Sequence, residues 1–146
     1  MTSPRQLPAL LPGEFEIADD VNELLYRQAT TPYWDPNSKQ PSSNSFGPAS
    51  VDHGKPSFSR SSKTTAQDSR DWHNSNGRAE SHGVWACTVS EVAESQTRAI
   101  DDSAVEGAKG PGHCYVDYRG VDKKDERVIR SFLLAKALAR GEISTT

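Results

Sequence analysis

The sequence lacks the features that mark membrane, secreted and disulfide-rich proteins. No stretch approaches the roughly 18–20 consecutive apolar residues of a membrane span. The apolar stretch at residues 7–11 is interrupted by proline and is too short for the core of a secretory signal. The two cysteines, Cys87 and Cys114, fit a reducing compartment, where a thiol acts as a small apolar side chain. We therefore expect a soluble, cytoplasmic protein that does not engage a membrane.

The chain also lacks a basic excess. Its 146 residues carry 17 basic and 20 acidic side chains, which gives a net charge of -3 at pH 7. Phosphate contacts supply much of the affinity of a nucleic-acid binder, so this balance argues against that role. The length suits one domain with a core that needs no metal or disulfide. The hydrophobic content of 34% is low, which indicates that part of the chain is loop.

The pattern of apolar residues predicts a small α+β domain over residues 21–146, preceded by an irregular arm over residues 1–20. Strands are expected around 21–28, 84–89 and 113–118, with a short strand near 14–17. In the third strand, alternation places Cys114 and Val116 on one face and His113 and Tyr115 on the other. Asp122 and Gly141 are good caps for a C-terminal helix that packs on this sheet.

Residues 35–82 form a long polar segment with twelve serines. The segment is either a disordered linker or a functional loop pinned by its aromatic residues Phe46, Phe58 and Trp72. Three large aromatics favour the pinned loop. Within it, Thr65 and Asp68 resemble a capping box, which predicts a short helix from about residue 66 to 74. A second capping box, Thr88 with Glu91, predicts a helix after the strand at 84–89.

The C-terminal helix is apolar nearly all round in its second half. One wide face holds Val128, Ile129, Phe132, Ala135 and Ala139, which we expect to cover the sheet. Leu134 and Leu138 then point away, beside a basic stripe. Either the helix lies between two layers, or this second face meets a partner. The candidate partner-binding residues are Lys123, Arg127, Arg130, Leu134 and Leu138.

Known catalytic and phosphate-binding motifs are not found: G-x-x-x-x-G-K-[ST], G-x-G-x-x-G, G-x-S-x-G and H-E-x-x-H are all missing. His82, Cys87, His113 and Cys114 do not have metal-chelating spacing, because each neighbouring pair falls on opposite faces of a strand. We therefore expect no metal and no cofactor. Whether the chain is an enzyme stays open.

A second candidate site mixes cations, hydroxyls and aromatics, a combination that suits an anionic ligand with a stacking ring. Its members lie between residues 26 and 60: Tyr26, Arg27, Ser43, Ser45, His53, Lys55 and Arg60. The same residue types also occur in any solvated loop.

Part of this region resembles small uncharacterised bacterial proteins. The resemblance covers roughly residues 25–60 through Tyr26-Arg27-Gln28, then SS-x-x-F-x-P from Ser42, then D-x-G from Asp52, with weaker similarity at GVWACTVSEV and HCYVDYRG. It implies no activity. A looser analogy is to ADP-ribosyltransferase-like folds, with Arg27 and Ser43 or Ser45 in the early positions. Its late acid would be Glu91, Asp117 or Glu142.

Three functions follow as hypotheses. The leading one is a protein-interaction subunit of a bacterial multi-protein system (an adaptor, regulator or immunity-type inhibitor), because the helix is two-sided and no catalytic motif is present. The alternative is an enzyme or sensor that acts on a nucleotide-like anion through Arg27 and residues 42–60. The third is nucleic-acid binding through the basic stripe of the C-terminal helix.

Overall fold

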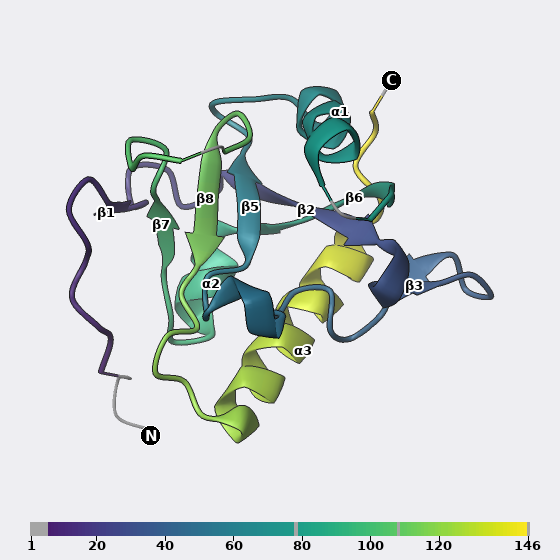
Figure 1. The fold of residues 1–146 in the computed structure, drawn as a ribbon. Coiled ribbons are helices and arrows are strands. Elements are labelled where there is room, and N and C mark those ends of the chain that lie inside the picture. Colours follow the sequence, from purple (N-terminus) through teal and green to yellow (C-terminus); the bar gives the residue numbers. More distant parts are fainter. Residues whose placement is uncertain (1–5, 78, 108, 146) are drawn as a thin grey trace.

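The computed structural model describes residues 6–77, 79–107 and 109–145. It is an α+β fold in which helices cover both faces of a six-stranded sheet (Figure 1). The sheet strands are β1 (Phe15–Glu16), β2 (Leu24–Thr30), β5 (Ser57–Arg60), β6 (Ser81–Thr88), β7 (Ala99–Asp101) and β8 (His113–Val116). The helices are α1 (Ala66–Asn76), α2 (Val89–Glu94) and α3 (Lys123–Arg140), with 3-10 turns η1 (Thr31–Tyr33) and η2 (Ser50–Asp52). A separate hairpin joins β3 (Trp34–Asp35) to β4 (Gln40–Pro41).

The strand order in the sheet is β1-β7-β8-β5-β2-β6, and the paired strands are antiparallel. The three strands predicted from the sequence are confirmed as β2, β6 and β8. Of these three strands, β2 and β6 are neighbours in the sheet. Strand β8 is separated from β2 by β5. The described residues contain no helix that is long and apolar enough to cross a membrane.

The two faces of the sheet differ in chemistry because successive strand residues alternate between them. On the core face, Leu25 pairs with Cys87 and Phe58 pairs with Cys114, and all four are at most 1% exposed. The α3 helix seals this face. The opposite face, called the outer face below, carries Ser57, Ser59 and His113 and is partly covered by α1. In Figure 1 α1 and α3 lie on opposite sides of β2 and β6.

The α3 helix begins and ends where its caps predict. The Asp122 carboxylate accepts a hydrogen bond from the Asp125 amide at 2.8 Å, and Gly141 ends the helix with a φ of 90°. The face that covers the sheet was predicted correctly for Ile129 and Phe132 and wrongly for Leu134 and Leu138, which were expected to point away. Ile129, Leu133 and Ala137 are fully buried, and Phe132, Leu134 and Leu138 pack against the same core.

The outward side of α3 therefore holds most of the face that was expected to be buried. Val128 is 60% exposed, and Ala135 and Ala139 are also exposed. The reason is that the helix carries apolar residues on two arcs, and packing chooses the arc with the larger side chains. Burying leucines removes more apolar area from water than burying alanines.

The structure also corrects the description of residues 35–82 as one long loop. This segment contains β5, a central strand of the sheet, and α1, which confirms the short helix predicted at about 66–74. Phe46 and Phe58 are 0% and 1% exposed, and their rings lie 5.8 Å apart. Of the two interpretations, the structure favours the pinned segment. The predicted caps are also present, with Thr65 accepting from the Asp68 amide and Thr88 exchanging hydrogen bonds with Glu91.

Candidate functional site

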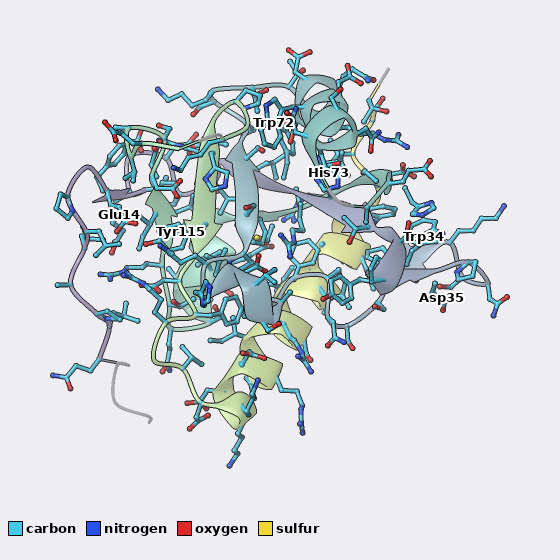
Figure 2. The ribbon with its side chains drawn as sticks, viewed as in Figure 1. Glu14, Trp34, Asp35, Trp72, His73 and Tyr115 are labelled. Carbon is cyan, nitrogen blue, oxygen red and sulfur yellow. The ribbon has the colours of Figure 1, made fainter. Side chains whose placement is uncertain are left out.

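A cavity of about 790 Å³ lies on the outer face of the sheet, bordered by α1. Strands β2, β5 and β8 supply Tyr26, Ser57, Ser59 and His113 to its lining, and α1 supplies Trp72. Figure 2 shows Trp72 and His73 on α1, above the strands. The volume is in the range of pockets that bind small molecules.

At this cavity three side chains form a hydrogen-bonded series. The hydroxyl of Ser57 lies 3.0 Å from Nε2 of His113, and Nδ1 of His113 lies 2.6 Å from a carboxylate oxygen of Asp102. An ionised carboxylate can only accept, so the proton between His113 and Asp102 belongs to Nδ1. In the neutral imidazole Nε2 then carries a lone pair and can accept the proton of Ser57.

Strand pairing explains how three residues far apart in the chain meet. Ser59 pairs with His113 across β5 and β8, so Ser57, two residues away on the same face, is the diagonal neighbour of His113. Asp101 pairs with Cys114 across β7 and β8, so the next residue, Asp102, comes opposite His113. Side chains of all three residues thus reach the outer face.

Exposure decreases along the series from the serine to the carboxylate. Ser57 is exposed, the His113 side chain is 16% exposed and the Asp102 side chain is 11% exposed. The same order holds in serine hydrolases, where the serine attacks, the histidine moves its proton and the sheltered carboxylate orients the ring. Chemically, the arrangement can therefore activate a hydroxyl.

A second series of polar side chains runs along the cavity beside Ser59. We call it the serine relay; it consists of Ser59, Ser69, Gln28 and Ser81. The hydroxyls of Ser59 and Ser69 lie 2.9 Å apart, and the Gln28 amide nitrogen donates to Ser69 at 3.0 Å. The Ser81 hydroxyl donates to the Gln28 amide oxygen at 2.7 Å.

Arg27 lines the cavity, but its guanidinium is bound to the chain itself. It donates to the backbone oxygens of Ser45 (2.6 Å), Ser57 (2.8 Å) and Gly47 (3.2 Å). It also lies over the Phe58 ring, 5.2 Å from the centroid. Burial lowers the pKa of Arg27. These contacts make Arg27 a clamp between β2, the turn at 45–47 and the start of β5.

Arg60 lies outside the cavity, on the core face of β5. It is 2% exposed and forms ion pairs with Glu23, Asp101 and Asp19 at 2.8, 2.9 and 3.3 Å. The hydrogen bonds that Arg60 donates to Glu23 raise the pKa of Arg60, because they favour its charged form. The guanidinium hydrogen bonds of Arg60 are therefore made within this network, and Arg60 does not face the cavity.

The other predicted ligand residues are dispersed. Tyr26 lines the cavity, and burial raises its pKa. Ser43 is exposed, while Ser45 is buried and donates to the Ser42 carbonyl at 2.8 Å. His53 is exposed on the turn after η2, with a φ of 51°.

Lys55 lies beside a different group, with its ammonium 5.8 Å from the centroid of Tyr115. The Tyr115 hydroxyl donates to the Glu14 carboxylate at 2.7 Å, so the N-terminal segment covers this part of the outer face (Figure 2). Of the seven predicted ligand residues, the cavity therefore brings together only Tyr26 and Arg27.

The acids of the ADP-ribosyltransferase analogy pair elsewhere or lie away from the cavity. Glu91 pairs with Arg140 at 2.8 Å, and the fully buried Asp117 pairs with Arg98 and Arg119. The Glu142 carboxylate lies against Gly83, at the end of the sheet beyond β6.

The basic stripe of α3 is divided by packing. Lys123 and Arg127 are exposed, whereas Arg130 pairs with Glu126 at 3.5 Å and lies against Gly47. The two cysteines are free and fully buried, and burial raises the pKa of each, to about 12 for Cys87. Neither thiol is therefore placed to act as a nucleophile. Within the described residues, no three His, Cys, Asp or Glu side chains gather as a metal site.

Sequence reasoning missed Ser57, Asp102 and His113 as a group. Alternation in SFSR and HCYV does indicate that Ser57 and His113 point to the less apolar side of their strands. The missing information is which strands are neighbours. Comparisons with models of protein families, with curated proteins and with solved structures find no match for this chain, so the site rests on its own geometry.

Proposed function

We propose that the chain is a serine hydrolase that cleaves an ester or thioester of a small molecule held in the outer-face cavity. The observation that carries the proposal is the series Ser57–His113–Asp102, which has the right connectivity, distances and order of exposure. The aromatic side chains of Tyr26 and Trp72 in the cavity favour a substrate with a flat or apolar part.

The chemistry follows from the hydrogen bonds. The Ser57 oxygen attacks the acyl carbon while Nε2 of His113 takes the serine proton, and the tetrahedral intermediate collapses to an acyl ester of Ser57. His113 returns the proton to the leaving oxygen or sulfur. A water molecule, deprotonated by His113, then releases the acid and restores the Ser57 hydroxyl. Asp102 holds the ring and stabilises its charged form throughout.

The first experiment is covalent labelling. Purified protein is treated with diisopropyl fluorophosphate, and the modified peptide is identified by mass spectrometry. We expect one adduct on Ser57 and none in Ser57→Ala. Labelling of other residues only, or of none, would refute the proposal.

The second experiment measures hydrolysis of p-nitrophenyl acetate and butyrate. We expect His113→Asn to lower the rate about a thousandfold, because the serine then has no base. His53→Asn is the matched control, since His53 is exposed and lies outside the cavity lining. Equal rates in the two variants would show that His113 is not the base.

A second candidate function is self-association through α3, and it rests on a different observation. The exposed side of the helix carries a row of apolar residues that we call the outer seam, formed by the exposed Val128, Ala135 and Ala139 and by Phe132, which is half-buried. Their spacing of four, three and four residues is that of a helix-packing face, and Val128 is 60% exposed. This keeps the interaction-subunit hypothesis but moves its surface away from Leu134 and Leu138.

The test of this candidate is the mass of the protein in solution by light scattering over a range of concentrations. We expect a dimer that Val128→Asp converts to a monomer. Lys124→Asp, at an exposed position in the first turn of α3, is the control. A monomer at all concentrations would rule the candidate out.

A further inference from the structure

The serine relay has no part in the proton transfers described above, yet it ends beside the nucleophile. Ser57 and Ser59 are two residues apart on one strand and face the same cavity. The rise of a strand separates such positions by about 6–7 Å. A substrate carbonyl whose carbon approaches the Ser57 oxygen therefore has Ser59 as the next hydroxyl along the same face, on the side to which its oxygen can point.

One consistent set of hydrogen-bond directions runs along the relay and ends at Ser59. The Ser81 hydroxyl accepts from the Gly83 amide at 3.3 Å. It can donate to the Gly83 carbonyl at 3.1 Å or to the Gln28 amide oxygen at 2.7 Å, and the shorter contact is the one that continues the relay. The other end of that amide is then a donor, and it is bonded to Ser69 at 3.0 Å.

The next hydrogen bond of the relay joins the hydroxyls of Ser69 and Ser59. Having accepted from Gln28, Ser69 can donate its own proton to Ser59 across 2.9 Å. In this arrangement Ser59 accepts from Ser69, and its own proton is available to a group in the cavity.

We infer that Ser59 is a catalytic residue that donates a hydrogen bond to the carbonyl oxygen of the substrate and to the oxyanion formed from it, and that Ser69 and Gln28 orient it. This inference rests on the proposed hydrolase function. A donor that is already oriented toward the developing charge lowers the barrier without reorganising during the reaction.

The experiment compares kcat and KM for p-nitrophenyl acetate in matched serine variants. Ser59→Ala should lower kcat about a hundredfold with KM unchanged, because the lost bond strengthens in the transition state. Ser59→Thr keeps the hydroxyl and should retain most of the rate. Ser75→Ala is the control, an exposed serine of α1 that is not part of the cavity lining.

Ser69→Ala tests the orienting role and serves as the second variant if Ser59→Ala does not fold. It should lower kcat about tenfold, and Ser59→Thr should remain close to wild type. A kcat in Ser59→Ala or Ser69→Ala equal to that in Ser75→Ala overturns the inference. So does a loss in Tyr26→Phe that exceeds the loss in Ser59→Ala, because the donor would then be the Tyr26 hydroxyl.

The labelling experiment distinguishes failure of the hydrolase proposal from failure of the inference about Ser59. If wild-type protein forms no Ser57 adduct with diisopropyl fluorophosphate, the hydrolase proposal itself fails and the inference fails with it. If Ser57 is labelled and kcat is indifferent to Ser59, the hydrolase proposal stands and only the inference about Ser59 is refuted.

Discussion

The Arg60 network leads to a graded prediction, because three carboxylates share one buried cation but differ in exposure. The Glu23 carboxylate binds the guanidinium through both oxygens, at 2.8 and 3.1 Å, and its side chain is 2% exposed. Asp101 binds at 2.9 Å and is 3% exposed, whereas Asp19 binds at 3.3 Å and is 76% exposed. Neutralising each acid in turn therefore removes one negative charge from a site of known solvent exposure.

Removing one partner of a buried ion pair typically costs about 3–5 kcal/mol, since the other charge is left without compensation. Two acids remain around Arg60 in each variant, so we expect the lower end, about 3 kcal/mol, for Glu23→Gln and for Asp101→Asn. An exposed pair contributes about 0–1 kcal/mol, so Asp19→Asn should change stability by less than about 1 kcal/mol.

The assay is urea unfolding followed by circular dichroism, with thermal melts in parallel. A loss of about 3 kcal/mol corresponds to a fall in Tm of roughly 6–12 °C for a chain of this size. Equal losses in the exposed and buried variants would refute the reasoning, as would a Glu23→Gln protein as stable as wild type.

The same network predicts a dependence on pH. Burial raises the pKa of Glu23, but hydrogen bonds from Arg60 and Ser62 outweigh it and hold the pKa below its ordinary 4.5. The pKa of Asp101 is held below 3.8 by Ser103 and Arg60 in the same way. A carboxyl with a lowered pKa stabilises the fold above its unfolded pKa and loses that contribution as the pH falls through the folded value. Wild-type stability should fall below about pH 4.5, and less steeply in Glu23→Gln.

Three further predictions concern buried hydrogen bonds and the packing of α3. Arg27→Met should lower the free energy of unfolding by about 3 kcal/mol, because hydrogen bonds from a charged donor to three carbonyls are lost. Urea unfolding measures the loss, and an unchanged unfolding midpoint would contradict the prediction. Leu134→Asp should lower the free energy of unfolding by about 3 kcal/mol and Val128→Asp by less than about 0.5 kcal/mol, since of these two residues only Leu134 packs against the core. Thermal melts of the two variants measure the difference. A larger loss in Val128→Asp than in Leu134→Asp would favour the face first expected from the sequence. Tyr118→Phe should cost about 1 kcal/mol, because its hydroxyl donates to the buried Phe46 carbonyl at 2.7 Å, and a Tm equal to that of wild type would refute it.

Short-range signals explain which elements could be predicted. The caps at Thr65, Thr88 and Asp122 work within three residues, so each capping bond is determined by neighbours in the sequence. Strands β2, β6 and β8 are rich in apolar or β-favouring residues. Strand β5 reads as polar, because two of its four residues are serines on the outer face and a third is a buried arginine, so the local pattern gave no indication of a central strand.

The amino-acid sequence alone determined the α+β class, the ends of the helices and the alternation that turns His113 away from Cys114 and Val116. These properties depend on interactions between residues that are near in the chain. The tertiary structure decided the rest: that β5 lies between β2 and β8, that Asp102 comes opposite His113, and which arc of α3 covers the sheet. Strand order and helix rotation are set by contacts between residues far apart in the chain, where several arrangements satisfy the same local pattern and only the burial of the whole core selects one.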